Sequence, residues 1–130
     1  MIQNKVLSKQ LVRDQFENWN KAIQTGDPDT VVKLYHEKGT LIPTLSNQVR
    51  YNHNEIKDYF VHFLAKKPKG EINESNIHIF EESKTASYVG LYTFEFGDGS
   101  KATCRFSYLY QFNDQGEGLI LHHHSSLLPE

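Results

Sequence analysis

Three consecutive histidines, His122, His123 and His124, are the residues whose type and spacing most directly suggest chemistry in this sequence. In an extended strand neighbouring side chains point to opposite faces, so only His122 and His124 can share a site. These two imidazoles could bind a transition-metal ion, which would still need a third ligand from elsewhere, such as His36 or His53. No motif of fixed metal-ligand spacing accompanies the run, so we predict no metal site and no cofactor.

Hydrogen bonding to a ligand is the simpler functional interpretation of the same strand. If His122, His124 and Ser126 point into a cavity, their imidazole and hydroxyl groups can bind an acidic or polar molecule. The alternative is a pair of structural histidines near a contact between subunits. The residue types leave both interpretations open.

Arg105 is one of three arginines, and its planar guanidinium is suited to binding a carboxylate through two hydrogen bonds. Alternation along its strand places Arg105 opposite the aromatic residues, unless a β-bulge changes the register. We therefore expect Arg105 to form either a carboxylate clamp in a pocket or an ion pair between subunits.

Aromatic residues offer a second set of candidate ligand contacts. Trp19, Tyr35 and Tyr92 could line an apolar pocket and supply indole and phenol donors, with core packing as the alternative. Asp14 and Asp27 are the carboxylates considered for general acid–base catalysis. Asp14 has polar neighbours and Asp27 is expected to cap a helix, so we predict no catalytic residue.

Composition limits the classes of partner. The 130 residues are expected to form one domain spanning 1–130, with 14 basic and 16 acidic residues and a net charge of -2. This balance argues against nucleic acid or an anionic membrane as a partner. With a single cysteine, no secretory h-region and no run of about 20 apolar residues, cytoplasmic localisation is the expectation.

Helices are predicted in the N-terminal half, where apolar residues recur every three or four positions. One face of the first helix would carry Leu7, Leu11, Val12, Phe16, Trp19, Ala22 and Ile23. Asp27 followed by Pro28 is expected to begin a short second helix that includes Tyr35. Asn52, with Glu55 three residues later, is expected to cap a third helix.

Strands are predicted in the C-terminal half, where the hydrophobic period changes to two. They are expected near residues 72–80, 85–96, 101–112 and 118–126. A further strand at 40–45 contains Pro43, which restricts it to a sheet edge or a bulge. Helices followed by an antiparallel meander indicate an α+β fold, with three N-terminal helices packed on a mostly antiparallel sheet.

The two central strands are predicted to have faces of different character. One face carries Tyr88, Tyr92, Phe94 and Phe96 together with Cys104, Phe106, Tyr108, Tyr110 and Phe112. The opposite face carries Val89, Leu91, Thr93, Thr103, Arg105, Ser107, Leu109 and Gln111. The aromatic face should pack against the helices, and the mixed face suits a subunit interface. An ordinary solvated face is the alternative.

The terminal run from Leu119 to Glu130, LILHHHSSLLPE, resembles the ending of bacterial relatives of the calcium/calmodulin-dependent kinase association domain, within the NTF2-like superfamily. Trp19, the Gly26–Asp27 pair and the third helix around Tyr59 are similar to the family in the same order. The resemblance implies a cone-shaped curved sheet that holds a pocket against the helices, a homodimer as the basic assembly, and a small carboxylate as the class of ligand. The chain has no kinase motif, neither a glycine-rich phosphate loop nor an HRD or DFG triplet.

Three classes of function remain open from the sequence. The first is a non-catalytic domain for oligomerisation or ligand binding. The second is a small isomerase, dehydratase or pathway accessory enzyme acting on a polar or carboxylate substrate, which would need a proton donor of perturbed pKa in the pocket. The third is a module that binds a separately encoded protein. Fold alone does not choose among them.

Overall fold

The first helix forms where the apolar spacing predicts it. The structure is a computed structural model that describes residues 7–44 and 46–129. Helix α1 extends from Lys9 to Ile23, and the Ser8 hydroxyl caps it by accepting a hydrogen bond from the backbone N–H of Leu11. Its buried face carries Val12, Phe16, Trp19, Asn20, Ala22 and Ile23. The amphipathic pattern therefore fixes which side of α1 meets the sheet.

The second helix, α2, is shorter than predicted. It extends from Pro28 to Val32, and the Asp27 carboxylate caps it by accepting a hydrogen bond from the backbone N–H of Asp29. Tyr35, which we expected in this helix, is instead the first residue of strand β1 (Tyr35–Ile42). The start of the helix was predicted correctly and its end was not.

Strand β1 lies at an edge of the sheet, as Pro43 predicted. It ends at Ile42, whereas the predicted strand continued to residue 45, which lies outside the described residues. Leu41 and Arg50 exchange two backbone hydrogen bonds of 2.9 and 2.8 Å. This isolated bridge fixes the backbone of Arg50 beside the edge strand.

Helix α3 (His53–Leu64) begins at the predicted cap. The Asn52 side chain accepts a hydrogen bond from the backbone N–H of Glu55, and the Glu55 carboxylate accepts one from the backbone N–H of Tyr51. Ile56, Phe60, Phe63 and Leu64 are buried. The face of α3 that covers the site is thus set by the same apolar spacing that predicted the helix.

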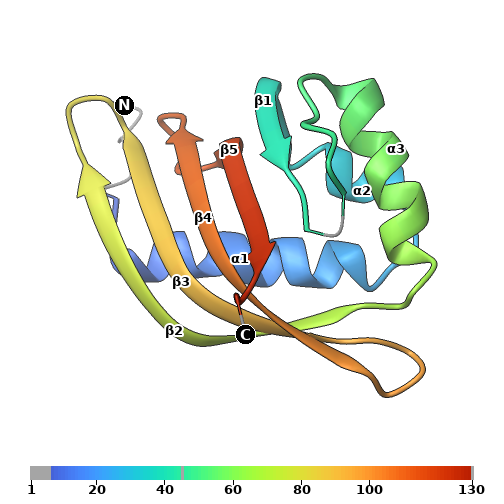
Figure 1. The fold of residues 1–130 in the computed structure, drawn as a ribbon. Coiled ribbons are helices and arrows are strands. Elements are labelled where there is room, and N and C mark those ends of the chain that lie inside the picture. The colour runs from blue at the N-terminus through green and yellow to red at the C-terminus, as the bar shows by residue number, and fades with distance from the viewer. Residues whose placement is uncertain (1–6, 45, 130) are drawn as a thin grey trace.

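The four C-terminal strands agree with the predicted runs to within a few residues. They are β2 (Lys69–Phe80), β3 (Thr85–Glu95), β4 (Lys101–Phe112) and β5 (Gly118–Leu127). The sheet has the order β1-β5-β4-β3-β2, with β1 parallel to β5 and every other pair antiparallel. Figure 1 shows the curved sheet with α1 crossing it and α3 beside β1. The α+β prediction is confirmed.

The bend of β2 and β3 depends on a glycine. The register between these strands shifts between Ile72 and Glu74, and Gly90 lies opposite Ser75. A Cβ atom at Gly90 would lie 2.0 Å from the backbone oxygen of Glu74, so no other residue fits there without moving β2. The close approach of the two strands lets the sheet curve around α1.

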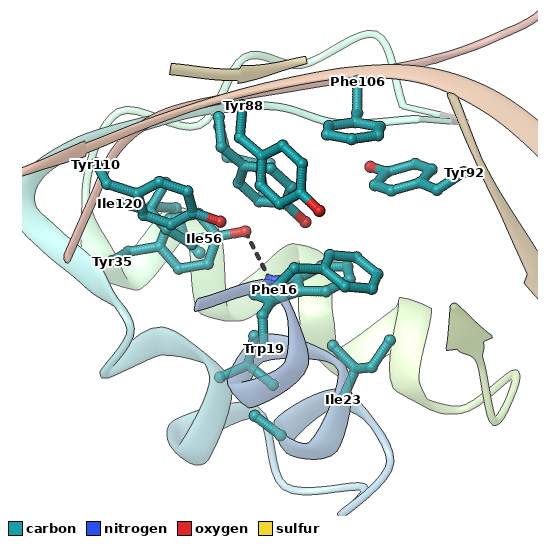
Figure 2. Packing of buried hydrophobic residues seen from close by; sticks show 14 of the residues in the cluster. Phe16, Trp19, Ile23, Tyr35, Ile56, Tyr88, Tyr92, Phe106, Tyr110 and Ile120 are labelled. Atoms are coloured by element: carbon teal, nitrogen blue, oxygen red, sulfur yellow. Dashed lines mark hydrogen bonds between the residues drawn. The ribbon is translucent and has the colours of Figure 1, made fainter. Parts of the chain in front are cut away.

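The aromatic face of the sheet is the core, as predicted. Tyr88, Tyr92, Phe94, Cys104, Phe106, Tyr108, Tyr110 and Phe112 are all buried. Trp19 of α1 packs against Tyr92 with nearly parallel rings, their centroids 6.4 Å apart, and Figure 2 shows Trp19 and Phe16 beneath the sheet residues.

In the described part of the chain no helix has both the length and the apolar character to cross a bilayer.

Candidate functional site

A β-bulge in β5 decides which of the three histidines points into the core. Tyr110 of β4 pairs with Ile120, but the preceding residue Leu109 pairs with His122, so Leu121 is an extra residue on β5. Alternation from the buried Ile120 would place His122 inward. The inserted residue shifts the alternation by one position and places His123 inward instead.

The prediction that His122, His124 and Ser126 face the pocket is therefore wrong. His122 is exposed and the other two are half-buried, whereas His123 is only 2 % exposed and Ser125 is buried. The three predicted residues share the outward face of the sheet, on the side away from α1. The bulge is the physical reason, because it exchanges the two faces beyond Leu121.

A chain of hydrogen bonds connects the inward residues, beginning at Trp19. The indole Nε1–H donates to the Tyr35 hydroxyl at 3.2 Å, the contact drawn as a dashed line in Figure 2. The Tyr35 hydroxyl lies 2.8 Å from Nδ1 of His123. Because Tyr35 accepts from Trp19, its own proton is free to go to His123, which makes Nδ1 the acceptor.

The chain continues from the other ring nitrogen of His123. Nε2 lies 3.1 Å from the Tyr92 hydroxyl, which donates to Ser125 Oγ at 2.6 Å. With Nδ1 accepting, Nε2 carries the ring proton and donates to Tyr92. Ser125 Oγ then bonds the Thr44 hydroxyl, which donates to Cys104 Sγ at 3.7 Å. Every hydroxyl in this chain thus has one donor role and one acceptor role.

His123 is held in its neutral form. Burial, with smaller contributions from the neighbouring His122 and His124, lowers its pKa from 6.5 to about 3. A proton on Nδ1 would also take away the acceptor that Tyr35 uses. Burial likewise raises the pKa of Tyr35 and of Tyr92 well above 10, so both phenols stay protonated donors. The inner site is therefore polar but uncharged.

This inner site surrounds a cavity of about 10 Å³. Its lining residues are Trp19, Leu41, Pro43, Thr44, Tyr59, Phe60, Phe63, Tyr92, Phe94, His123 and Ser125. A volume of this size is near the lower limit for a single water molecule. The inner site as it stands has no room for an organic ligand.

A larger chamber of about 230 Å³ lies next to it and shares Thr44, Tyr59 and Phe63 with the inner cavity. Its lining residues are Thr44, Ser46, Arg50, Tyr59, His62, Phe63 and Lys66. The Tyr59 hydroxyl donates to the backbone oxygen of Thr44 at 3.1 Å, and its ring stacks on Phe63. The outer chamber thus has a basic rim and an aromatic wall.

Arg50 is the buried charged residue that lines this chamber, and only 7 % of it is exposed. Its Nη1 donates to the Asp58 carboxylate at 2.7 Å and to the backbone oxygen of Glu55 at 3.0 Å. The guanidinium lies over the Tyr59 ring at 5.9 Å from the centroid. Its Nη2 donates to Ser46 Oγ at 3.4 Å. Its buried Nε has no hydrogen-bond partner among the described residues, so Arg50 retains a donor for a further acceptor.

The structure separates the predicted site residues into two groups. It brings Trp19, Tyr35 and Tyr92 together around His123, with Trp19 and Tyr92 lining the inner cavity. It places Arg105 on the outward face, exposed and paired with Ser126 of β5, because β4 has no bulge at that position. The role of all seven predicted residues in binding a ligand stays a prediction.

Sequence reasoning missed Thr44, Arg50, Tyr59, His123 and Ser125. Thr44 lies in the strand predicted at 40–45 but was not assigned to a site, and Arg50 lies in no periodic run. The positions of both follow from the segment that connects β1 to α3. Tyr59 was predicted on the third helix but not assigned to a site. His123 and Ser125 were excluded by an alternation that takes no account of the bulge.

Among residues 7–44 and 46–129, no three His, Cys, Asp or Glu side chains gather closely enough to hold a metal ion.

Comparison with known proteins agrees with this fold. The calcium/calmodulin dependent protein kinase II association domain family matches residues 8–129. A crystal structure from Xanthomonas campestris, whose description places it with these association domains, is 37 % identical with a TM-score of 0.86 and covers 100 % of this chain and 98 % of its own. No curated protein matches the chain.

More distant structures share the fold alone. An NTF2-like superfamily protein from Salmonella enterica is 17 % identical with a TM-score of 0.75, covering 94 % of this chain and 92 % of its own. A protein with a cystatin-like fold from Nostoc punctiforme is 10 % identical with a TM-score of 0.78, covering 98 % and 96 %. The match over residues 8–129 and the 37 % identical relative together show that this chain belongs to the calcium/calmodulin dependent protein kinase II association domain family.

Proposed function

We propose that residues 1–130 form one self-associating, non-catalytic domain that binds a small carboxylate in the outer chamber beside Arg50. The observation that carries this proposal is the buried guanidinium, whose Nε has no partner among the described residues although Nη1 has two. A buried charged group with an unused donor is costly unless an acceptor satisfies it. A ligand carboxylate would supply that acceptor.

The surroundings of Arg50 favour a small anion with an apolar body. Lys66 and His62 lie on the same rim and add basic groups, whereas Tyr59 and Phe63 form the wall. Asp58 already occupies Nη1, whereas Nη2 makes only a long hydrogen bond of 3.4 Å to Ser46 Oγ, so the ligand is expected to bind through the Nε and Nη2 side of the guanidinium. The proposed ligand class is the one implied by the family resemblance, but its proposed anchor is Arg50 rather than Arg105.

A small isomerase or dehydratase is the alternative function, and it would need an acid or a base in the pocket. The described residues that line the two chambers include no carboxylate. His123 is the imidazole of the inner cavity, and its hydrogen bonds and its low pKa keep it neutral. His62 is the imidazole of the outer chamber, where it lies on the exposed rim with no lining carboxylate among the described residues to orient it. Binding is therefore better supported by this geometry than acid–base catalysis.

Self-association is proposed through the outward face of the sheet. Val89, Leu91 and Leu109 on this face are half-buried in the single chain, and polar side chains surround them. A mixed face of this kind resembles the surfaces that proteins bury against one another. The name of the family, association domain, agrees with a second copy of this chain as the partner.

Benzoate is a suitable probe for the chamber because it combines a carboxylate with a flat apolar ring. We expect isothermal titration calorimetry to detect binding to the wild-type protein, and Arg50→Gln to weaken it at least tenfold because the charge-assisted hydrogen bonds are lost. The matched control is Arg13→Gln, which removes an exposed arginine of α1 and should leave binding unchanged.

A folding defect in Arg50→Gln is separated from a binding defect by a second variant. Lys66 is exposed on the rim, so Lys66→Gln should keep the thermal stability of the wild type and weaken benzoate binding by about threefold. Benzoate binding that is equally strong in both variants and the wild type would contradict the chamber as the site, as would the absence of any binding.

A further inference from the structure

Three residues form a straight row across the outward face of the sheet. Glu74 of β2 pairs with Leu91 of β3, and Leu91 pairs with Arg105 of β4. The acid and the base are exposed, and Leu91 between them is half-buried. The strand-pairing register therefore places opposite charges on the two sides of one apolar side chain.

These two charges lie two strands apart. Adjacent strands lie about 4.8 Å apart, so the backbones of Glu74 and Arg105 are separated by about 10 Å. Within the described residues neither side chain belongs to an ion pair. Both charges are therefore available to a partner that approaches this face.

We propose that a second copy of this chain packs on this face with a two-fold axis along β3, so that Arg105 of each copy meets Glu74 of the other. This inference rests on the proposed self-association and specifies its geometry. A rotation by 180° about an axis parallel to β3 places β2 of one copy opposite β4 of the other. Residues that belong to one row in the first copy then face the same row in the second copy. Leu91 then lies opposite its own copy on the axis, and two identical ion pairs flank it.

The neighbouring residues fit the same arrangement. Val89, two positions along β3, is half-buried and lies next to Leu91 on the axis. His122 and His124 lie on β5, two strands from β3, and therefore at the rim of the contact.

Charged residues that would face a charge of the same sign in the second copy lie away from the centre of the contact. Lys69, Glu95 and Lys101 form another row, which is four residues from Arg105 along β4. At about 3.3 Å per residue, this row is about 13 Å from the centre. Because packed twisted sheets cross at about 30°, the end rows of the two copies diverge while the central rows stay in contact. The lysines of the two copies are therefore kept apart.

Charge reversal tests this register. We expect Arg105→Glu and Glu74→Arg, each alone, to weaken self-association at least tenfold, because each places two pairs of like charges in the interface. The variant carrying both changes should self-associate again. The matched control is Glu82→Arg in the turn between β2 and β3, which should self-associate like the wild type.

An equimolar mixture of the two single variants gives the sharpest result. In a mixed pair the acid introduced at position 105 of one copy faces the base introduced at position 74 of the other, and the unchanged Glu74 and Arg105 face each other. Native mass spectrometry should therefore show a one-to-one heterodimer, while each variant alone is mainly monomeric. Single variants that dimerise as strongly as the wild type would overturn this register and leave the proposed self-association in place. A monomeric wild type in the same experiment would overturn the self-association itself.

Discussion

Acidification from pH 6 to pH 4 is expected to lower the free energy of unfolding by about 2.5 kcal/mol through His123 alone. Its pKa is lowered to about 3 in the folded protein, against 6.5 in an unperturbed histidine. Between these two values the unfolded chain binds a proton that the folded chain does not, so falling pH favours unfolding. The contribution is fully present above about pH 6.5 and is lost at about 1.4 kcal/mol per pH unit down to about pH 3.

Replacement of His123 by glutamine should remove that dependence. Glutamine has one acceptor and one donor group for Tyr35 and Tyr92 but no proton to gain in this range. Urea unfolding at a series of pH values would give the slope, which is expected to fall by about one proton in His123→Gln. The control on the same strand is the exposed His122→Gln, which leaves the buried hydrogen bonds of His123 in place and should keep most of the wild-type slope. Equal slopes in all three proteins would contradict a neutral, buried His123.

Replacement of Trp19 by alanine is expected to cost about 3–5 kcal/mol of the free energy of unfolding. The indole is 1 % exposed and packs against aromatic rings from α1, α3 and the sheet. Its loss would leave a large cavity and would remove the donor to Tyr35. Because small domains are stable by only about 5–15 kcal/mol, this variant should be close to unfolding at moderate temperature.

Trp19→Phe separates packing from hydrogen bonding. Phenylalanine keeps an aromatic ring but has no N–H group, so we expect a loss of about 1–2 kcal/mol. Thermal or urea unfolding of both variants measures the difference. A Trp19→Ala protein as stable as Trp19→Phe would show that the indole is not the packing centre between α1 and the sheet.

Local patterns predicted the elements well where no irregularity intervenes. β3 and β4 pair without a register shift from Thr85 to Glu95, so simple alternation placed Tyr92 on the core face and Arg105 on the other. The caps at Asp27 and Asn52 were predicted because a side chain that accepts a backbone N–H within a few residues is a local interaction.

Features that depend on distant segments were not predictable. Tyr35 leaves the helical pattern because it pairs with Ile120 of β5, far along the chain. The bulge at Leu121 inserts one residue among ordinary strand formers, and it decides the orientation of His123. Arg50 is placed by its bridge to Leu41, for which the sequence gives no periodic signal. The fold was therefore predictable while more than half of the candidate site was not.

Native mass spectrometry of the untagged wild-type protein at micromolar concentration tests the central claim most directly, because one spectrum reports subunit number and any retained small molecule. We expect a dimer or a larger even assembly, and a retained mass, where one is seen, should disappear in Arg50→Gln. A monomer under these conditions would contradict the proposal that this domain works by self-association.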